Sequence, residues 1–88
     1  PKLGEEKVLM VGHVFEQAMQ EKIKNDVSKY RTDTGVTQEE LAQEVGVSRQ
    51  TIIALEKGNY TPSILLALKI ASFFKMPVEK IFKITYEK

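Results

Sequence analysis

One central segment constrains the fold of this chain more than any other, because it holds two short helical patterns separated by almost no connecting residues. Thr37 and Glu40 stand at the spacing of a capping box, in which each side chain binds a backbone N–H of the other residue. Gly46 interrupts the first pattern, and Ser48 is placed to cap a second helix over residues 49–57. The segment predicts two helices joined by a tight turn.

Apolar residues recur in both patterns at the spacing of a helix with one buried face. We expect the buried positions to be Leu41, Ala42 and Val45 in the first helix and Ile52 and Leu55 in the second. Ala42 is small and lies where the two helices must approach, and Val47 is placed to fill the corner between them. The pair is therefore expected to form a fixed unit that leaves the outer face of its second helix exposed.

A further helix is predicted before this unit, over residues 21–31. Ile23, Val27 and Tyr30 fall on one face of that helix. Gly35 follows and supplies the left-handed conformation that favours a helix end. The chain before this helix is less regular, and residues 1–20 are expected to be an N-terminal extension that either continues the helix backwards or is partly disordered.

A fourth helix is predicted over residues 62–75, with Thr61 as its N-cap and Pro62 at its first position, where the missing N–H is harmless. Its expected buried side chains are Ile64, Ala67, Leu68, Ala71 and Phe74.

Pro77 opens a last short helix whose expected core-facing residues are Val78, Ile81 and Phe82. Beyond it, apolar Ile84 alternates with polar neighbours, which predicts a short extended tail with one apolar edge. The sequence thus predicts an all-α fold with five helices, divided into residues 1–20 as an extension, 21–83 as the domain and 84–88 as the tail.

Composition sets outer limits on function. The 88 residues allow one compact domain, and the absence of cysteine excludes disulfides and thiolate metal sites. The longest apolar run, residues 8–11, is too short to span a bilayer, so no membrane association is expected, and we expect a cytoplasmic protein. The formal net charge is only +1, and by itself it does not support nucleic-acid binding.

Catalysis is not expected. His13 is the only histidine, and no carboxylate pair or cysteine lies near it at a spacing that suits a metal or a nucleophile. We also find no glycine-rich loop that would cradle a phosphate group. The sequence therefore predicts a protein that is not an enzyme and that has no cofactor and no catalytic metal.

The polar residues at the start of the second helix suit the edges of DNA bases. Arg49 can bind guanine through two hydrogen bonds, Gln50 can bind adenine in the same way, and the methyl group of Thr51 can contact thymine. Gln38 and Ser48 stand at helix starts, where free N–H groups favour a phosphate. Each of these residues alone is equally typical of a solvated surface or a helix cap, and their common order is what favours DNA.

Phosphate contacts are also expected from the loop that follows the second helix. Its candidate donors are Lys57, Asn59, Tyr60 and Thr61. Such contacts fix register on a duplex, whereas the base contacts determine sequence preference.

Residues 21–83 resemble the lambda repressor/Cro type of helix-turn-helix domain, also called the Xre family. The matching strings are Thr37-Gln38-Glu39-Glu40-Leu41-Ala42, Val45-Gly46-Val47-Ser48-Arg49-Gln50-Thr51-Ile52, Leu55-Glu56-Lys57-Gly58, Pro62-Ser63 and Leu68-Lys69-Ile70-Ala71. The resemblance implies a transcriptional regulator that binds an operator as a homodimer, and two-fold symmetry would make that operator palindromic. Because the chain has no room for a sizeable effector domain, repression by blocking polymerase is the simplest expected mechanism. The resemblance also implies that Gln38 braces against Gln50, and that Arg31 pairs with Glu56.

Three apolar residues depart from this family pattern: Leu65 and Phe73 on the fourth helix and Ile53 on the second helix of the pair. They are either scattered exposed residues or, as we prefer, Leu65 and Phe73 are covered by the extension or by a second subunit. Strand pairing through the tail is another route to a dimer. An alternative function is that of an antitoxin-like or phage-type regulator whose main partner is another protein, bound through the N-terminal extension.

Overall fold

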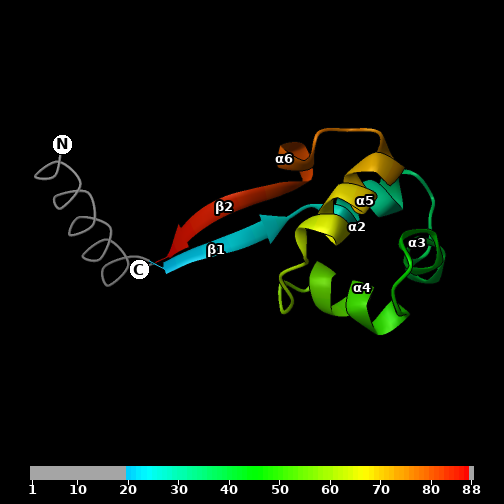
Figure 1. Ribbon diagram of the computed structural model, residues 1–88, viewed down its shortest axis with the longest axis horizontal. Helices are drawn as coiled ribbons and strands as arrows, with labels where there is room; N and C mark the ends of the chain where they lie inside the picture. The colour runs from blue at the N-terminus through cyan, green and yellow to red at the C-terminus, as the bar shows by residue number, and fades with distance from the viewer. Residues whose placement is uncertain (1–19, 88) are drawn as a thin grey trace, which may run out of the picture.

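The computed structural model describes residues 20–87, in which a compact group of helices carries a two-stranded sheet that extends away from it (Figure 1). The elements in this part of the chain are β1 (Gln20–Asn25), α2 (Val27–Asp33), α3 (Gln38–Val45), α4 (Arg49–Glu56), α5 (Ile64–Phe74), α6 (Val78–Ile81) and β2 (Phe82–Glu87). The five helices agree with the predicted number. The sheet does not, so all-α describes the fold only approximately.

The two strands come from opposite ends of the described chain and pair in antiparallel orientation. In this register Ile23 lies opposite Ile84 and Asn25 opposite Phe82, so the apolar positions of both strands share one face. The alternating pattern of the tail is therefore confirmed as an extended strand. Its partner is the segment 20–25 of the same chain.

The predicted helix over residues 21–31 is wrong in its first half, because residues 20–25 form β1 and the helix starts at Val27. Ile23 and Val27 are four residues apart, which fits a helix as well as a strand followed by a helix. The turn between them is held by Asn25, whose Oδ1 accepts the Val27 N–H (3.1 Å) and whose Nδ2 donates to the Leu55 carbonyl (2.9 Å). Contacts distant in sequence decide the conformation here.

The core lies between the helices, and its buried apolar side chains are Val27, Leu41, Ala42, Val45, Ile52, Leu55, Leu66, Ile70, Ala71 and Ile81. All five side chains predicted to be buried in the central helix pair are among them. Val47 packs against this core from the turn, as expected. Burial of these residues holds α3 and α4 in a fixed relation.

The start of α5 differs from the prediction. The helix begins at Ile64, and its N-cap is Ser63, whose Oγ accepts the N–H of Leu66 at 3.1 Å, rather than Thr61. Pro62 therefore precedes the helix.

The buried face of α5 is also rotated from the expected one. Leu66 and Ile70 are buried, whereas Ile64 and Leu68, which we expected in the core, are 81% and 51% exposed. The helix is apolar on several faces, so periodicity alone did not define which face would pack against α3 and α6. Ala71 is buried, as predicted.

The two unusual apolar residues of this helix have different surroundings. Phe73 packs against the core of its own chain, with its ring in edge-to-face contact with Phe74 at a centroid distance of 5.1 Å. Leu65 remains 63% exposed. The expected short helix after Pro77 is present as α6, with Ile81 buried and Phe82 packed against the core.

Candidate nucleic-acid interface

The start of α3 is a closed capping box. The Thr37 hydroxyl accepts the Glu40 N–H (3.0 Å), and the Thr37 N–H donates to the Glu40 carboxylate (2.9 Å). The hydrogen bond that the Thr37 N–H donates to the carboxylate lowers the pKa of Glu40 below its ordinary value of 4.5, and the Thr37 side chain adds to this effect. The box confirms the predicted N-terminus of this helix and places Gln38 at its first position.

Gly46 makes the turn between the two helices possible. It has φ 77° and ψ 34°, a left-handed conformation that costs L residues energy and that glycine adopts freely. Two residues later Ser48 caps α4, its Oγ accepting the Thr51 N–H at 3.2 Å and lying 3.0 Å from the Thr51 hydroxyl. The chain therefore passes from α3 into α4 through only three residues.

The first turn of α4 presents two long polar side chains to solvent. Arg49 and Gln50 are exposed, whereas the Ser48 and Thr51 hydroxyls bond to each other at the cap. Thr51 is half-buried. Arg49 and Gln50 are thus the groups of this turn best able to bind outward.

A polar network behind this turn ties three helices together. Arg31 at the end of α2 holds the Glu56 carboxylate through two hydrogen bonds, Nε to Oε2 at 2.6 Å and Nη2 to Oε1 at 3.2 Å. Its Nη1 donates to the Val36 carbonyl at 2.9 Å. Gln38 Nε2 donates to Glu56 Oε1 at 3.0 Å. The expected Arg31–Glu56 pair is confirmed, and Gln38 bonds to Glu56 rather than bracing against Gln50.

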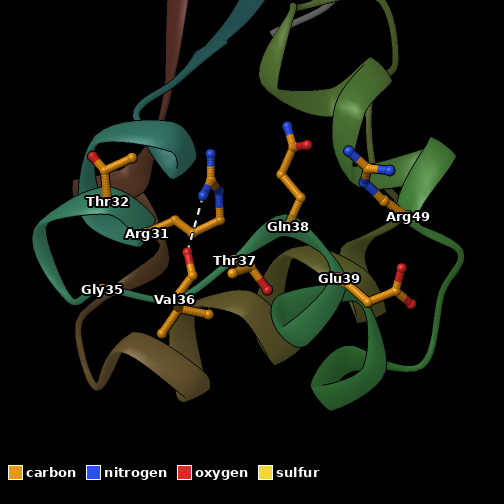
Figure 2. A pocket seen from close by; sticks show the side chains of 8 residues that line it. All are labelled: Arg31, Thr32, Gly35, Val36, Thr37, Gln38, Glu39 and Arg49. Atoms are coloured by element: carbon orange, nitrogen blue, oxygen red, sulfur yellow. Dashed lines mark hydrogen bonds between the residues drawn. The ribbon is translucent and has the colours of Figure 1, made fainter.

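An open cleft of about 700 Å³ lies beside this network, between the end of α2, the start of α3 and the start of α4. Figure 2 shows Gln38 standing between Arg31 and Arg49, each from a different helix. The cleft therefore joins the helix start at Gln38 to the exposed guanidinium of Arg49.

The loop after α4 carries the remaining candidate residues at the opposite end of that helix. Lys57, Asn59, Tyr60 and Thr61 are exposed, and Gly58 makes the turn with φ 81°. The eight residues of α4 separate this loop from Arg49 by roughly 12 Å along the helix axis. The nine candidate residues thus lie on the first turn of α4, at the neighbouring start of α3, and in the loop at the far end of α4.

A family model described as helix-turn-helix matches residues 27–81, which is more than half of the chain. The chain belongs to this family, the Xre or lambda-repressor type of helix-turn-helix domain. An HTH-type transcriptional regulator of Methanocaldococcus jannaschii is 57% identical over 60 residues, which are 68% of this chain and 91% of the relative.

Two further matches are more distant. The transcriptional repressor RstR of the cryptic phage CTXphi of Vibrio cholerae is 33% identical over 51 residues, covering 58% of this chain and 46% of the repressor. The crystal structure of the restriction-modification controller protein C.AhdI of Aeromonas hydrophila is similar with a TM-score of 0.58 and 28% identity, covering 61% of this chain and 82% of that one.

The helix-turn-helix unit of this family is formed by α3 and α4. The outward residues of this unit could be predicted from the sequence, whereas the cleft residues Thr32 and Glu39 and the bond between Gln38 and Glu56 could not. The resemblance pointed to an Arg31–Glu56 pair, and Gln38 at a helix start was the available signal for the third member. Within residues 20–87, no helix is long and apolar enough to cross a membrane.

Proposed function

We propose that this helix-turn-helix protein binds double-stranded DNA in a sequence-specific manner and regulates transcription. The observation that supports this most directly is the exposed pair Arg49 and Gln50 on the first turn of the second helix of the unit. An α-helix fits the major groove, where Arg binds guanine and Gln binds adenine through two hydrogen bonds each. Thr51 is the third proposed reading residue.

The backbone contacts are assigned to residues on either side of α4. Gln38 and Ser48 stand at helix starts, where N–H groups and the helix dipole favour a phosphate. Lys57, Asn59, Tyr60 and Thr61 would bind phosphates from the loop at the far end. The low net charge of +1 is compatible with this role, because the contacts require local cations and donors rather than a large total charge.

Repression is the proposed sign of regulation. It is favoured by the similarity to a phage transcriptional repressor, and a bound domain that covers a promoter needs no further activity to block it. A repressor that binds as a homodimer would recognise two half-sites in a palindromic operator.

The homodimer itself is proposed on the exposed apolar residues of α5. Ile64, Leu65 and Leu68 are 81%, 63% and 51% exposed and lie on one side of the helix, and we call them the α5 stripe. Large apolar residues grouped in this way are typical of an interaction surface. A dimer formed by strand pairing through the tail is less favoured, because β2 already pairs with β1 of its own chain.

The test begins with selection of bound sequences from a random DNA pool by the wild-type chain, followed by binding titrations on the selected sequence. Arg49→Ala is expected to weaken specific binding by about 1–3 kcal/mol if Arg49 binds a guanine. Arg49→Lys keeps the charge but cannot form the bidentate hydrogen bonds to guanine. It should therefore lower sequence specificity while preserving the salt dependence of binding.

Lys80→Ala on α6 is the matched control, since Lys80 is exposed and outside the candidate interface. Unchanged affinity and specificity in Arg49→Ala and in Gln50→Ala would remove these residues from the proposed reading set. If no sequence is enriched by the wild-type chain even at low salt, the DNA-binding function is wrong and a protein partner becomes the better proposal.

A further inference from the structure

The bond between Gln38 and Glu56 brings together two residues 18 positions apart, at the point where three helices meet. Glu56 is the last residue of α4, and its side chain is only 7% exposed. Gln38, the first residue of α3, donates to Glu56 Oε1 at 3.0 Å. Gln38 also lines the cleft in which Arg49 lies (Figure 2). A nearly buried acid therefore contacts a residue of the proposed DNA interface.

The Glu56 carboxylate is itself held in place. Two hydrogen bonds from Arg31 reach its two oxygens, at 2.6 Å and 3.2 Å, and Arg31 is fixed in turn by its bond to the Val36 carbonyl. An ionised carboxylate with two charge-assisted hydrogen bonds is strongly oriented. Its Oε1 is therefore a fixed acceptor for Gln38.

A fixed acceptor selects one orientation of a glutamine amide. The carboxylate can only accept hydrogen bonds, so the Gln38 NH₂ group must face Glu56 and the Gln38 carbonyl oxygen must point away from it. The oxygen and nitrogen of an amide are similar in size, so without this partner the Gln38 amide could rotate by half a turn and exchange their positions. With Glu56 present, the carbonyl oxygen and the second N–H of Gln38 remain available in a defined arrangement.

We infer that Glu56 is a positioning residue for DNA recognition, which orients the amide of Gln38 so that Gln38 discriminates between base pairs instead of only anchoring a phosphate. An oriented acceptor and donor side by side match the N6 and N7 positions of adenine, whereas a phosphate can use only the donor. This inference rests on the proposed DNA binding and assigns Gln38 a second role in it.

The test compares Gln38→Met, Glu56→Gln and the double variant on the operator selected by the wild-type chain. Dissociation constants are measured for that operator and for duplexes carrying each single base-pair change. Gln38→Met keeps the length of the side chain but removes the amide, and it should lose about tenfold discrimination at one base-pair position. Glu56→Gln replaces the pure acceptor with a group that can also donate, and it should lose discrimination at the same position.

The double variant separates positioning from general support of the fold. If Glu56 acts through Gln38, Glu56→Gln should change discrimination little once Gln38→Met is present, as in a double-mutant cycle. Glu79→Gln on α6 is the charge-matched control, because Glu79 is exposed and outside the interface. It should leave discrimination at every position unchanged.

Three outcomes have distinct meanings. If the wild-type chain shows no sequence preference, the proposed DNA-binding function fails first. If the wild-type chain is specific and Gln38→Met retains all of its discrimination, the inference is overturned, even if Glu56→Gln does not fold. The inference would also be overturned if Glu56→Gln lowered base-pair discrimination equally in the wild type and in Gln38→Met, since Glu56 would then act only through the fold.

Discussion

Adjacent residues at the start of α3 have separate roles that depend on a few hydrogen bonds. Thr37 and Glu40 bind each other's backbone N–H groups and so define where the helix begins. Gln38 between them bonds to Glu56 on another helix. A capping residue replaced by alanine typically costs about 1 kcal/mol of stability. The cap thus stabilises the helix from which Gln38 reaches the candidate interface.

The capping box predicts a pH dependence of stability. Because the pKa of Glu40 is lowered in the folded chain, its ionised carboxylate contributes stability above about pH 4.5, and that contribution is lost as the pH falls through the folded-state pKa. Glu40→Gln should therefore be less stable than the wild type at pH 7, and the difference should shrink towards pH 3. Urea unfolding followed by circular dichroism at several pH values measures this difference.

Glu39→Gln is the control for this experiment, because Glu39 is the exposed neighbour and makes no capping-box hydrogen bond. The difference in stability between the wild type and Glu39→Gln should change less between the same pH values. A difference between wild type and Glu40→Gln that is constant from pH 7 to pH 3 would show that the carboxylate bond to the Thr37 N–H does not contribute.

At the scale of the element, α5 ends in an unfavourable conformation. Its C-cap Lys75 has φ 56° and ψ 46°, and no other residue except glycine in the described part of the chain has positive φ. The left-handed region costs an L residue about 1–2 kcal/mol, and glycine is the residue usually found at such a helix end. The turn is needed because Met76 and Pro77 must lead directly into α6.

Lys75→Gly should therefore increase the free energy of unfolding by about 0.5–1 kcal/mol, since relief of the strain exceeds the extra flexibility of glycine in the unfolded chain. Lys69→Gly provides the comparison within the same helix. Lys69 is exposed in the regular part of α5, where glycine should cost about 1 kcal/mol. Urea unfolding of both variants decides the matter, and equal destabilisation by the two substitutions would contradict the strain at Lys75.

At the scale of the whole molecule, the proposed assembly is a homodimer. One short helix contacts few base pairs, whereas two linked half-sites raise the affinity strongly. The α5 stripe, formed by Ile64, Leu65 and Leu68, is the surface on which we place the contact between two copies. The sheet carries a second apolar face with Ile23 opposite Ile84, and this face lies on the part of the molecule that extends away from the helices (Figure 1).

Leu65→Lys should convert the proposed dimer to a monomer, because it places a charge in an apolar contact. Sedimentation velocity of the wild type and the variant over a range of concentrations measures the change, and operator affinity should fall in parallel. Ser28→Lys introduces the same charge at an exposed position of another helix, α2, and should leave the dimer intact. A wild-type chain that sediments as a monomer at all concentrations would contradict the homodimer.

Local signals allowed much of the fold to be predicted. The caps at Thr37 and Ser48 and the turn at Gly46 depend on bonds within a few residues, and all three are found as expected. The side chains predicted to be buried in α3 and α4 are also buried. Each feature could be read from neighbouring residues, because the interactions that define it act between neighbours. The exposure of Arg49 and Gln50 followed from the same reasoning.

Tertiary contacts decided the rest. Residues 20–25 are a strand because β2, at the other end of the chain, offers a partner for their backbone groups. The face of α5 that is buried was set by packing, since an apolar helix has more than one face that could enter the core. The bond from Gln38 to Glu56 likewise required the folded chain. Sequence alone therefore defined the two central helices and their outward residues, whereas long-range packing defined the sheet, the α5 stripe and the network behind the interface.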